Sequence, residues 1–88
     1  LVGTAAARAR TVRQLADGVR AYALAGICVD LENLDDATRA ALPAFVRELR
    51  AALAPLGATV SQTVAAAAPE GELRAAGREA DRVIVMLY

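Results

Sequence analysis

The sequence predicts an α/β fold in which helices and strands alternate in the order α-β-α-β-α-β and the three strands run parallel. Two observations lead to this prediction. Apolar residues recur every three or four positions in segments that are each followed by a run suited to a strand. The connections are short, and helices that alternate with strands imply right-handed crossovers on a parallel sheet. The predicted helices cover residues 5–23, 42–54 and 70–80, and the predicted strands cover residues 26–31, 59–65 and 82–88.

The helices are predicted from their apolar stripes and from the residues at their ends. Thr4 precedes the first helix and can cap it, because its hydroxyl oxygen can accept a backbone N–H of the first turn. The second helix carries Phe45 and Leu49 at helical spacing. Pro43 is tolerated in a first turn but not in a helix interior. We therefore expect a separate short turn over residues 36–41 before the second helix begins.

Composition restricts the classes of function. The chain has 88 residues and no net charge, and it shows no basic patch with interleaved aromatic residues, so nucleic-acid binding has little support. It contains no His and a single Cys, which makes a zinc site very unlikely and excludes an internal disulfide. Its apolar stretches are much shorter than the roughly 20 residues of a membrane span. Because the chain starts without Met and stops within an apolar run, we expect it to be a piece of a longer protein.

Two carboxylates follow the first predicted strand, Asp30 and Glu32. Alternate residues of a strand point to the same face, so these two acids point the same way. Like charges held close push their pKa values apart, which lets one group stay protonated while the other stays ionised. Such a pair at the carboxyl end of a parallel strand suits the cleavage of a glycosidic bond. The alternative is structural: Asp30 caps the next helix and Glu32 is a solvated loop residue.

The run Gly26-Ile27-Cys28-Val29-Asp30-Leu31-Glu32 resembles the fourth-strand signature D-G-x-D-x-D-x-E of glycoside hydrolase family 18, the chitinase family. Its closest resemblance is to the spore-germination and cell-wall-hydrolase branch, whose signature reads more like G-x-N-x-D-x-E-N. Residues 82–88 resemble the sixth strand of that family, which ends in M-x-Y-D, and residues 59–65 fall where the fifth strand belongs. The resemblance implies three strands of a (β/α)₈ TIM barrel.

The resemblance also implies roles for single residues. Glu32 would be the general acid that protonates the glycosidic oxygen. Asp30 would orient the substrate's N-acetyl group, which itself attacks the anomeric carbon. Tyr88 would donate a hydrogen bond to the acetamide oxygen, and Met86 would line the sugar pocket. The implied substrate is a β-1,4-linked N-acetylhexosamine polysaccharide, no cofactor is required, and an extracellular or cell-envelope location is suspected.

The chain departs from the family pattern at Ala25 and Cys28, where the family has Asp. No His or Lys is present to activate the Cys28 thiol, so we expect it to be a buried apolar side chain, on the same strand face as Asp30. In the next strand, Gln62 is expected to face the covering helices. Ser61 and Thr63 would then point to the opposite face as possible sugar contacts.

Two alternatives remain open at this point. One is a glycan-binding relative without catalysis. The other is a doubly wound α/β domain in which Asp30 and Glu32 hold Mg²⁺. In the enzyme interpretation, three strands cannot close a barrel and both sheet edges would stay unpaired, so we expect the 88-residue chain alone to be inactive.

Overall fold

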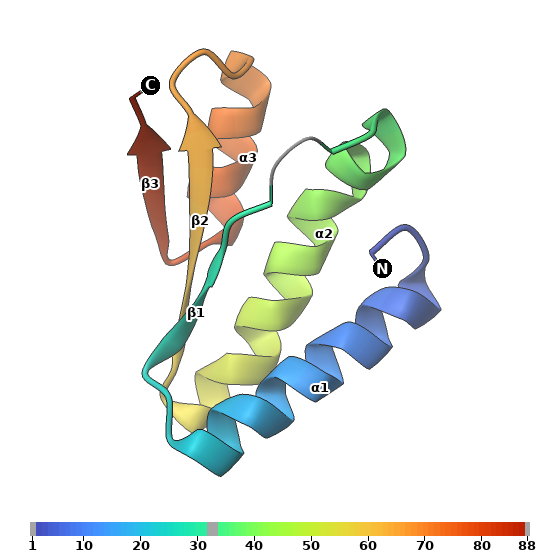
Figure 1. Ribbon diagram of the computed structural model, residues 1–88, viewed down its shortest axis with the longest axis vertical. Helices are drawn as coiled ribbons and strands as arrows, with labels where there is room; N and C mark the ends of the chain where they lie inside the picture. The colour runs from blue at the N-terminus through green and yellow to red at the C-terminus, as the bar shows by residue number, and fades with distance from the viewer. Residues whose placement is uncertain (1, 32–33, 88) are drawn as a thin grey trace.

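The computed structural model describes residues 2–31 and 34–87 (Figure 1). In this part of the chain, helices and strands alternate as predicted, and the strands form one open parallel sheet in the order β1-β2-β3. The predicted α/β fold with three parallel strands is therefore confirmed. The elements are α1 (Ala5–Tyr22), β1 (Gly26–Val29), α2 (Asp36–Leu53), the 3-10 helix η1 (Ala54–Leu56), β2 (Thr59–Ala65), α3 (Glu70–Glu79) and β3 (Arg82–Met86).

Capping residues define both ends of α1. The Thr4 hydroxyl oxygen accepts a hydrogen bond from the Ala7 N–H at 3.1 Å, which satisfies one of the free donors of the first turn. At the other end, Ala23 adopts a left-handed backbone with a φ of 52°, and its N–H donates to the carbonyl oxygen of Val19. This left-handed residue ends the helix and turns the chain toward β1.

Helix α2 is longer than predicted because it runs without a break through Pro43. It begins at Asp36, directly after Asp35, whose carboxylate accepts the Thr38 N–H at 2.7 Å. Pro43 has no N–H, so it cannot donate to the carbonyl oxygen of Arg39 four residues earlier. The expected separate turn over residues 36–41 is wrong. The cap at Asp35 and the long buried stripe of the helix offset the hydrogen bond that Pro43 removes.

The strand register assigns alternate residues to two faces of the sheet. On one face, Val29 lies beside Gln62, and Val60 and Val64 of the same strand β2 are buried under the helices. The prediction that Gln62 faces the helices is confirmed, since this side chain is only 7% exposed. All the helices of the described residues lie on this face, so the opposite face of the sheet has no cover among them (Figure 1).

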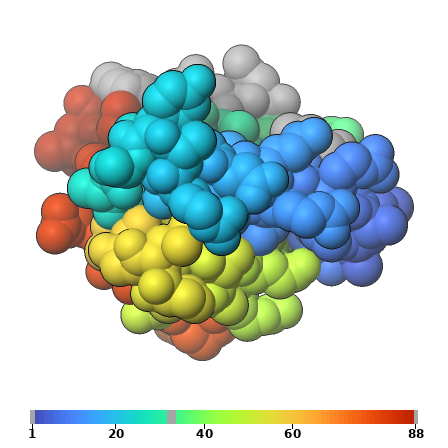
Figure 2. All heavy atoms as spheres, turned by 90° about the horizontal axis from the view of Figure 1, so that it is seen from below, coloured from blue at the N-terminus to red at the C-terminus, as the bar shows by residue number. Residues whose placement is uncertain are grey.

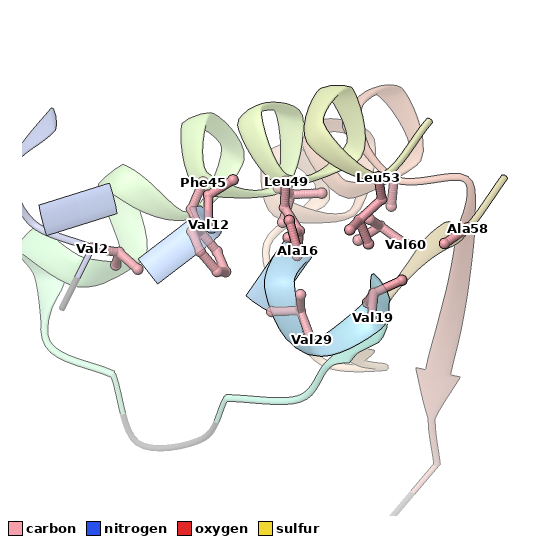
Figure 3. Close-up of a cluster of buried hydrophobic side chains, with 12 residues drawn as sticks. Val2, Val12, Ala16, Val19, Val29, Phe45, Leu49, Leu53, Ala58 and Val60 are labelled. Atoms are coloured by element: carbon pink, nitrogen blue, oxygen red, sulfur yellow. The ribbon is translucent and has the colours of Figure 1, made fainter. Parts of the chain in front are cut away.

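The core lies between α1, α2 and the helix-facing side of the sheet. Leu49 and Leu53 of α2 and Val60 of β2 are 0% exposed. Figure 3 shows that Val12 of α1 meets Phe45 of α2, so the two helices interleave their apolar stripes. Each fully buried side chain of this size contributes about 1.5–3 kcal/mol to the stability of the fold.

The amino-terminal ends of the strands are closed by α1, the end of α2 and η1, which pack together when the molecule is seen from below (Figure 2). Asp81 ties three elements together at this end. Its Oδ2 accepts the Val60 N–H at 2.8 Å, its Oδ1 lies 2.9 Å from Nε of Arg50, and its own N–H donates to the Val60 carbonyl oxygen at 2.8 Å. The start of β3 is thereby fixed to the start of β2 and to the last turns of α2.

Candidate functional site at the carboxyl end of the sheet

A hollow of about 330 Å³ lies at the carboxyl end of the sheet, among the end of β1, β2, β3 and the helices α2 and α3. Its position follows from the lengths of the strands. β1 ends at Val29, opposite Gln62, while β2 continues to Ala65, so the last residues of β2 have no neighbour from β1. Ligands of parallel α/β proteins bind beyond this edge of the sheet. The hollow is therefore the natural candidate for a functional site.

Asp30 and Thr63 meet at this hollow. Asp30 follows the last residue of β1 and is exposed, and the Thr63 hydroxyl of β2 donates a hydrogen bond to its Oδ1 at 2.7 Å. The Thr63 Oγ1 also lies 3.5 Å from the carbonyl oxygen of Val29. Among the described residues, Oδ2 of Asp30 has no hydrogen-bond partner. One carboxylate oxygen of the exposed Asp30 is thus held in place, and the other is free to accept a hydrogen bond from a ligand.

The remaining predicted contact residues divide into two groups. Met86, at the end of β3, is half-buried and lines the hollow together with Asp30 and Thr63. Ser61 and Cys28 are register partners one step closer to the amino ends of the strands, and they do not line the hollow. All of these residues lie on the strand face that the helices leave open.

The expectation that Cys28 is a buried apolar thiol is wrong, because this side chain is exposed. It lies on the strand face that none of the helices in the described part of the chain covers. Alternation along the strand predicts that side chains divide between two faces, but it does not predict which face the helices cover. The predicted general acid Glu32 and the predicted acetamide donor Tyr88 lie outside the described residues.

The inner part of the hollow contains residues to which the sequence assigned no functional role. Gln62 reaches it from the helix-facing layer, and Leu42 and Ala75 form part of its walls. At its rim, Nε of Arg39 in α2 lies 3.3 Å from Oε1 of Glu72 in α3. The only signal in the sequence that points to this region is Gln62, a polar residue in an otherwise apolar layer. Nothing in the sequence indicates the ion pair between Arg39 and Glu72.

Close to the hollow, Asp35 is the N-cap of α2. The Thr38 side chain and then the Thr38 backbone N–H favour the ionised carboxylate, so the pKa of Asp35 is lowered from its ordinary value of 3.8. Asp35 therefore remains ionised at neutral pH and stabilises the positive end of the α2 dipole. Its role is structural, since it does not line the hollow.

Among residues 2–31 and 34–87, no three side chains of the His, Cys, Asp and Glu types lie together in a group that could hold a metal ion. None of the helices in this range combines the length and the apolar character needed to cross a bilayer.

Comparison with known proteins gave no relative: no family model matches the chain, and neither a curated protein nor a solved structure is significantly similar to it.

Proposed function

We propose that this chain forms three consecutive strands and helices of a (β/α)₈ barrel and belongs to a glycoside hydrolase that cleaves β-1,4-linked N-acetylhexosamine polysaccharide. The observation that carries the proposal is the hydrogen bond of 2.7 Å between Thr63 and Asp30, beside Met86, at the carboxyl end of the sheet. In a barrel of this kind, catalytic residues come from the ends of several different strands.

The topology supports the barrel part of the proposal. The strands follow one another in the sheet in the order β1-β2-β3, as consecutive strands of a closed barrel do. Within the described residues, helices cover one face only, and the other face carries Cys28, Ser61, Thr63 and Ile84. In a closed barrel this second face becomes the filled interior, which gives the half-exposed Ile84 the apolar cover that it lacks here.

In the proposed reaction, Glu32 protonates the glycosidic oxygen as the bond to the anomeric carbon breaks. The carbonyl oxygen of the substrate's own N-acetyl group attacks that carbon, and water later opens the cyclic intermediate. Asp30 accepts the acetamide N–H through Oδ2, while Thr63 holds Oδ1 and fixes the direction of the carboxylate. Thr63 is therefore a positioning residue, and Met86 contacts the sugar.

The test uses the full-length protein that contains this chain and a chromogenic chitobioside as substrate. Replacing a general acid costs about 10²- to 10⁴-fold in rate, so Glu32→Gln is expected to reduce kcat by that factor. The matched control is Glu70→Gln, because the Glu70 side chain is 82% exposed and pairs only with Arg74 four residues away on the same helix, among the described residues. Equal rates for Glu32→Gln and wild type would contradict the proposal.

The Thr63→Val variant tests the role of the hydrogen bond, because valine keeps the shape of threonine and removes the donor to Asp30. We expect kcat to fall while KM changes little, since Asp30 acts on the acetamide as it attacks the anomeric carbon. The Ser61→Ala variant is the control on the same strand, one step away from the hollow. A fall in kcat of the same size for both variants would show that Thr63 has no special role.

A glycan-binding protein without catalysis is the second candidate, and Cys28 favours it. The family pattern has Asp at this position, and the exposed thiol of Cys28 cannot replace a carboxylate beside Asp30. In that case the wild-type protein binds chitooligosaccharides, and neither it nor Glu32→Gln releases product. Measurement of binding and hydrolysis on the same protein separates the two functions.

A further inference from the structure

The inner half of the hollow contains a polar group that the proposed hydrolysis does not use. Gln62 is only 7% exposed, and its side chain lines the hollow. Among residues 2–31 and 34–87, its amide has no hydrogen-bond partner. Among these residues, every side-chain N or O atom that is completely buried has a hydrogen-bond partner. The amide atoms of Gln62 therefore remain accessible from the hollow, where a ligand can satisfy them.

The side chains next to this amide are mostly apolar, and the uncompensated charge in the lining of the hollow is the Asp30 carboxylate. Leu42, Val64 and Ala75 line the hollow around Gln62. At the rim, the guanidinium of Arg39 is paired with the carboxylate of Glu72 at 3.3 Å, so these two charges compensate each other. An anionic ligand group that entered beside Gln62 would lose its hydration without gaining a free cation, and the Asp30 carboxylate in the same hollow would repel it. The part of the hollow next to Gln62 therefore favours a neutral ligand over an anionic one.

We propose that the inner half of the hollow binds a small, neutral, aliphatic carboxamide, whose amide pairs with the side chain of Gln62. The Gln62 amide presents a donor and an acceptor side by side, and another amide presents the complementary pair. The volume of about 330 Å³ lies in the size range of small-molecule sites. This binding goes beyond the proposed glycan cleavage, because it requires neither Glu32 nor any bond breakage.

Isobutyramide is the probe for this proposal, and Met86 is the reporter. Met86 lines the hollow and is the single methionine of this chain, so a ¹³C-methyl methionine label places one NMR signal at the site. In the full-length protein, the Met86→Leu variant identifies that signal. We expect the signal to shift in a saturable manner with isobutyramide. Isobutyrate, which has the same shape and a negative charge, is expected to give no saturable shift.

Two variants test the contact from different directions. Gln62→Leu removes both hydrogen bonds and keeps the volume, and it is expected to weaken isobutyramide binding about tenfold. Ala75→Leu fills the hollow from its wall and is expected to block binding while Gln62 stays in place. Thermal unfolding of each variant verifies that it is folded, and Gln62→Met replaces Gln62→Leu if that variant does not fold.

The outcomes separate this proposal from the proposed hydrolysis. The proposal is overturned if the Met86 signal does not saturate, if isobutyrate binds as tightly as isobutyramide, or if Gln62→Leu binds the amide as tightly as wild type. Chitobioside hydrolysis measured in parallel tests the other proposal. Saturable amide binding that depends on Gln62 supports the present proposal even in a protein that shows no hydrolysis.

Discussion

Removal of the Asp81 carboxylate is expected to destabilise the protein far more than removal of an ordinary surface acid. Asp81 Oδ2 accepts the backbone N–H of Val60 at 2.8 Å, and Val60 is 0% exposed. In Asp81→Ala, this N–H of a fully buried residue loses its acceptor. An unsatisfied buried donor costs about 1–3 kcal/mol. The Asp81 side chain is 28% exposed and that of Arg50 45% exposed, so their ion pair at 2.9 Å adds at most about 1 kcal/mol.

Two further variants separate these contributions. Asp81→Asn keeps a side-chain oxygen that can accept the Val60 N–H and loses only the charge opposite Arg50, so we expect it to cost less than about 1 kcal/mol. Asp17→Ala removes an ion pair with Arg20 whose side chains are 68% and 65% exposed, and it is expected to cost about 0–0.5 kcal/mol.

Urea and thermal unfolding of the purified protein measure the differences. For a chain of this size, each kcal/mol corresponds to a change in Tm of about 4–8 °C. We therefore expect the Tm to fall in the order Asp17→Ala, Asp81→Asn, Asp81→Ala, with a clear gap before the last. If Asp81→Ala were no less stable than Asp17→Ala, the argument from the buried N–H would be refuted.

Two other predictions concern backbone packing and pH. Gly26→Ala is expected to destabilise the fold by about 1–3 kcal/mol, because a Cβ there would press on the Thr59 carbonyl oxygen and lie 2.8 Å from the Thr59 Oγ1. At Gly18 an added methyl meets nothing within 4 Å, so Gly18→Ala is expected to stabilise α1 by about 1 kcal/mol. Urea unfolding that ranks the two variants the other way would contradict this expectation. The contribution of Asp35 to stability should be present at neutral pH and decline as pH falls below 3.8, because its pKa in the folded protein is lowered by Thr38. Unfolding of wild type and Asp35→Ala across pH 2–6 measures this decline. A difference in unfolding free energy between the two proteins that stays constant over this range would disprove it.

The sequence predicted the elements well where the pattern along the chain determines them. The bounds of β2 match the prediction, and the burial of its side chains alternates along the strand although Gln62 interrupts the alternation of apolar and polar residues. β1 ends at Val29 rather than at residue 31, since the end of a strand depends on the partner with which it pairs. α2 passes through Pro43 because its packing against the core outweighs the local cost of a proline.

The candidate site was predicted only in part, because it depends on the register between strands. The alternation of residues places Asp30 on one face of β1 and Thr63 on one face of β2. That the two side chains meet at 2.7 Å follows from the pairing of Val29 with Gln62, which the sequence alone does not provide. The exposure of Cys28 depends in the same way on which sheet face the helices cover.

The two ends of the sheet differ in how their polar groups are satisfied, and this difference supports a functional site at the carboxyl end. At the amino end, both Asp81 carboxylate oxygens have partners, and α1 and η1 close the surface (Figure 2). At the carboxyl end, among the described residues, Asp30 has one oxygen without a partner and the Gln62 amide has none. A buried polar group without a partner, as Gln62 is among these residues, lowers stability unless a ligand completes its hydrogen bonds. The carboxyl end is therefore where added ligand should raise the Tm of this protein.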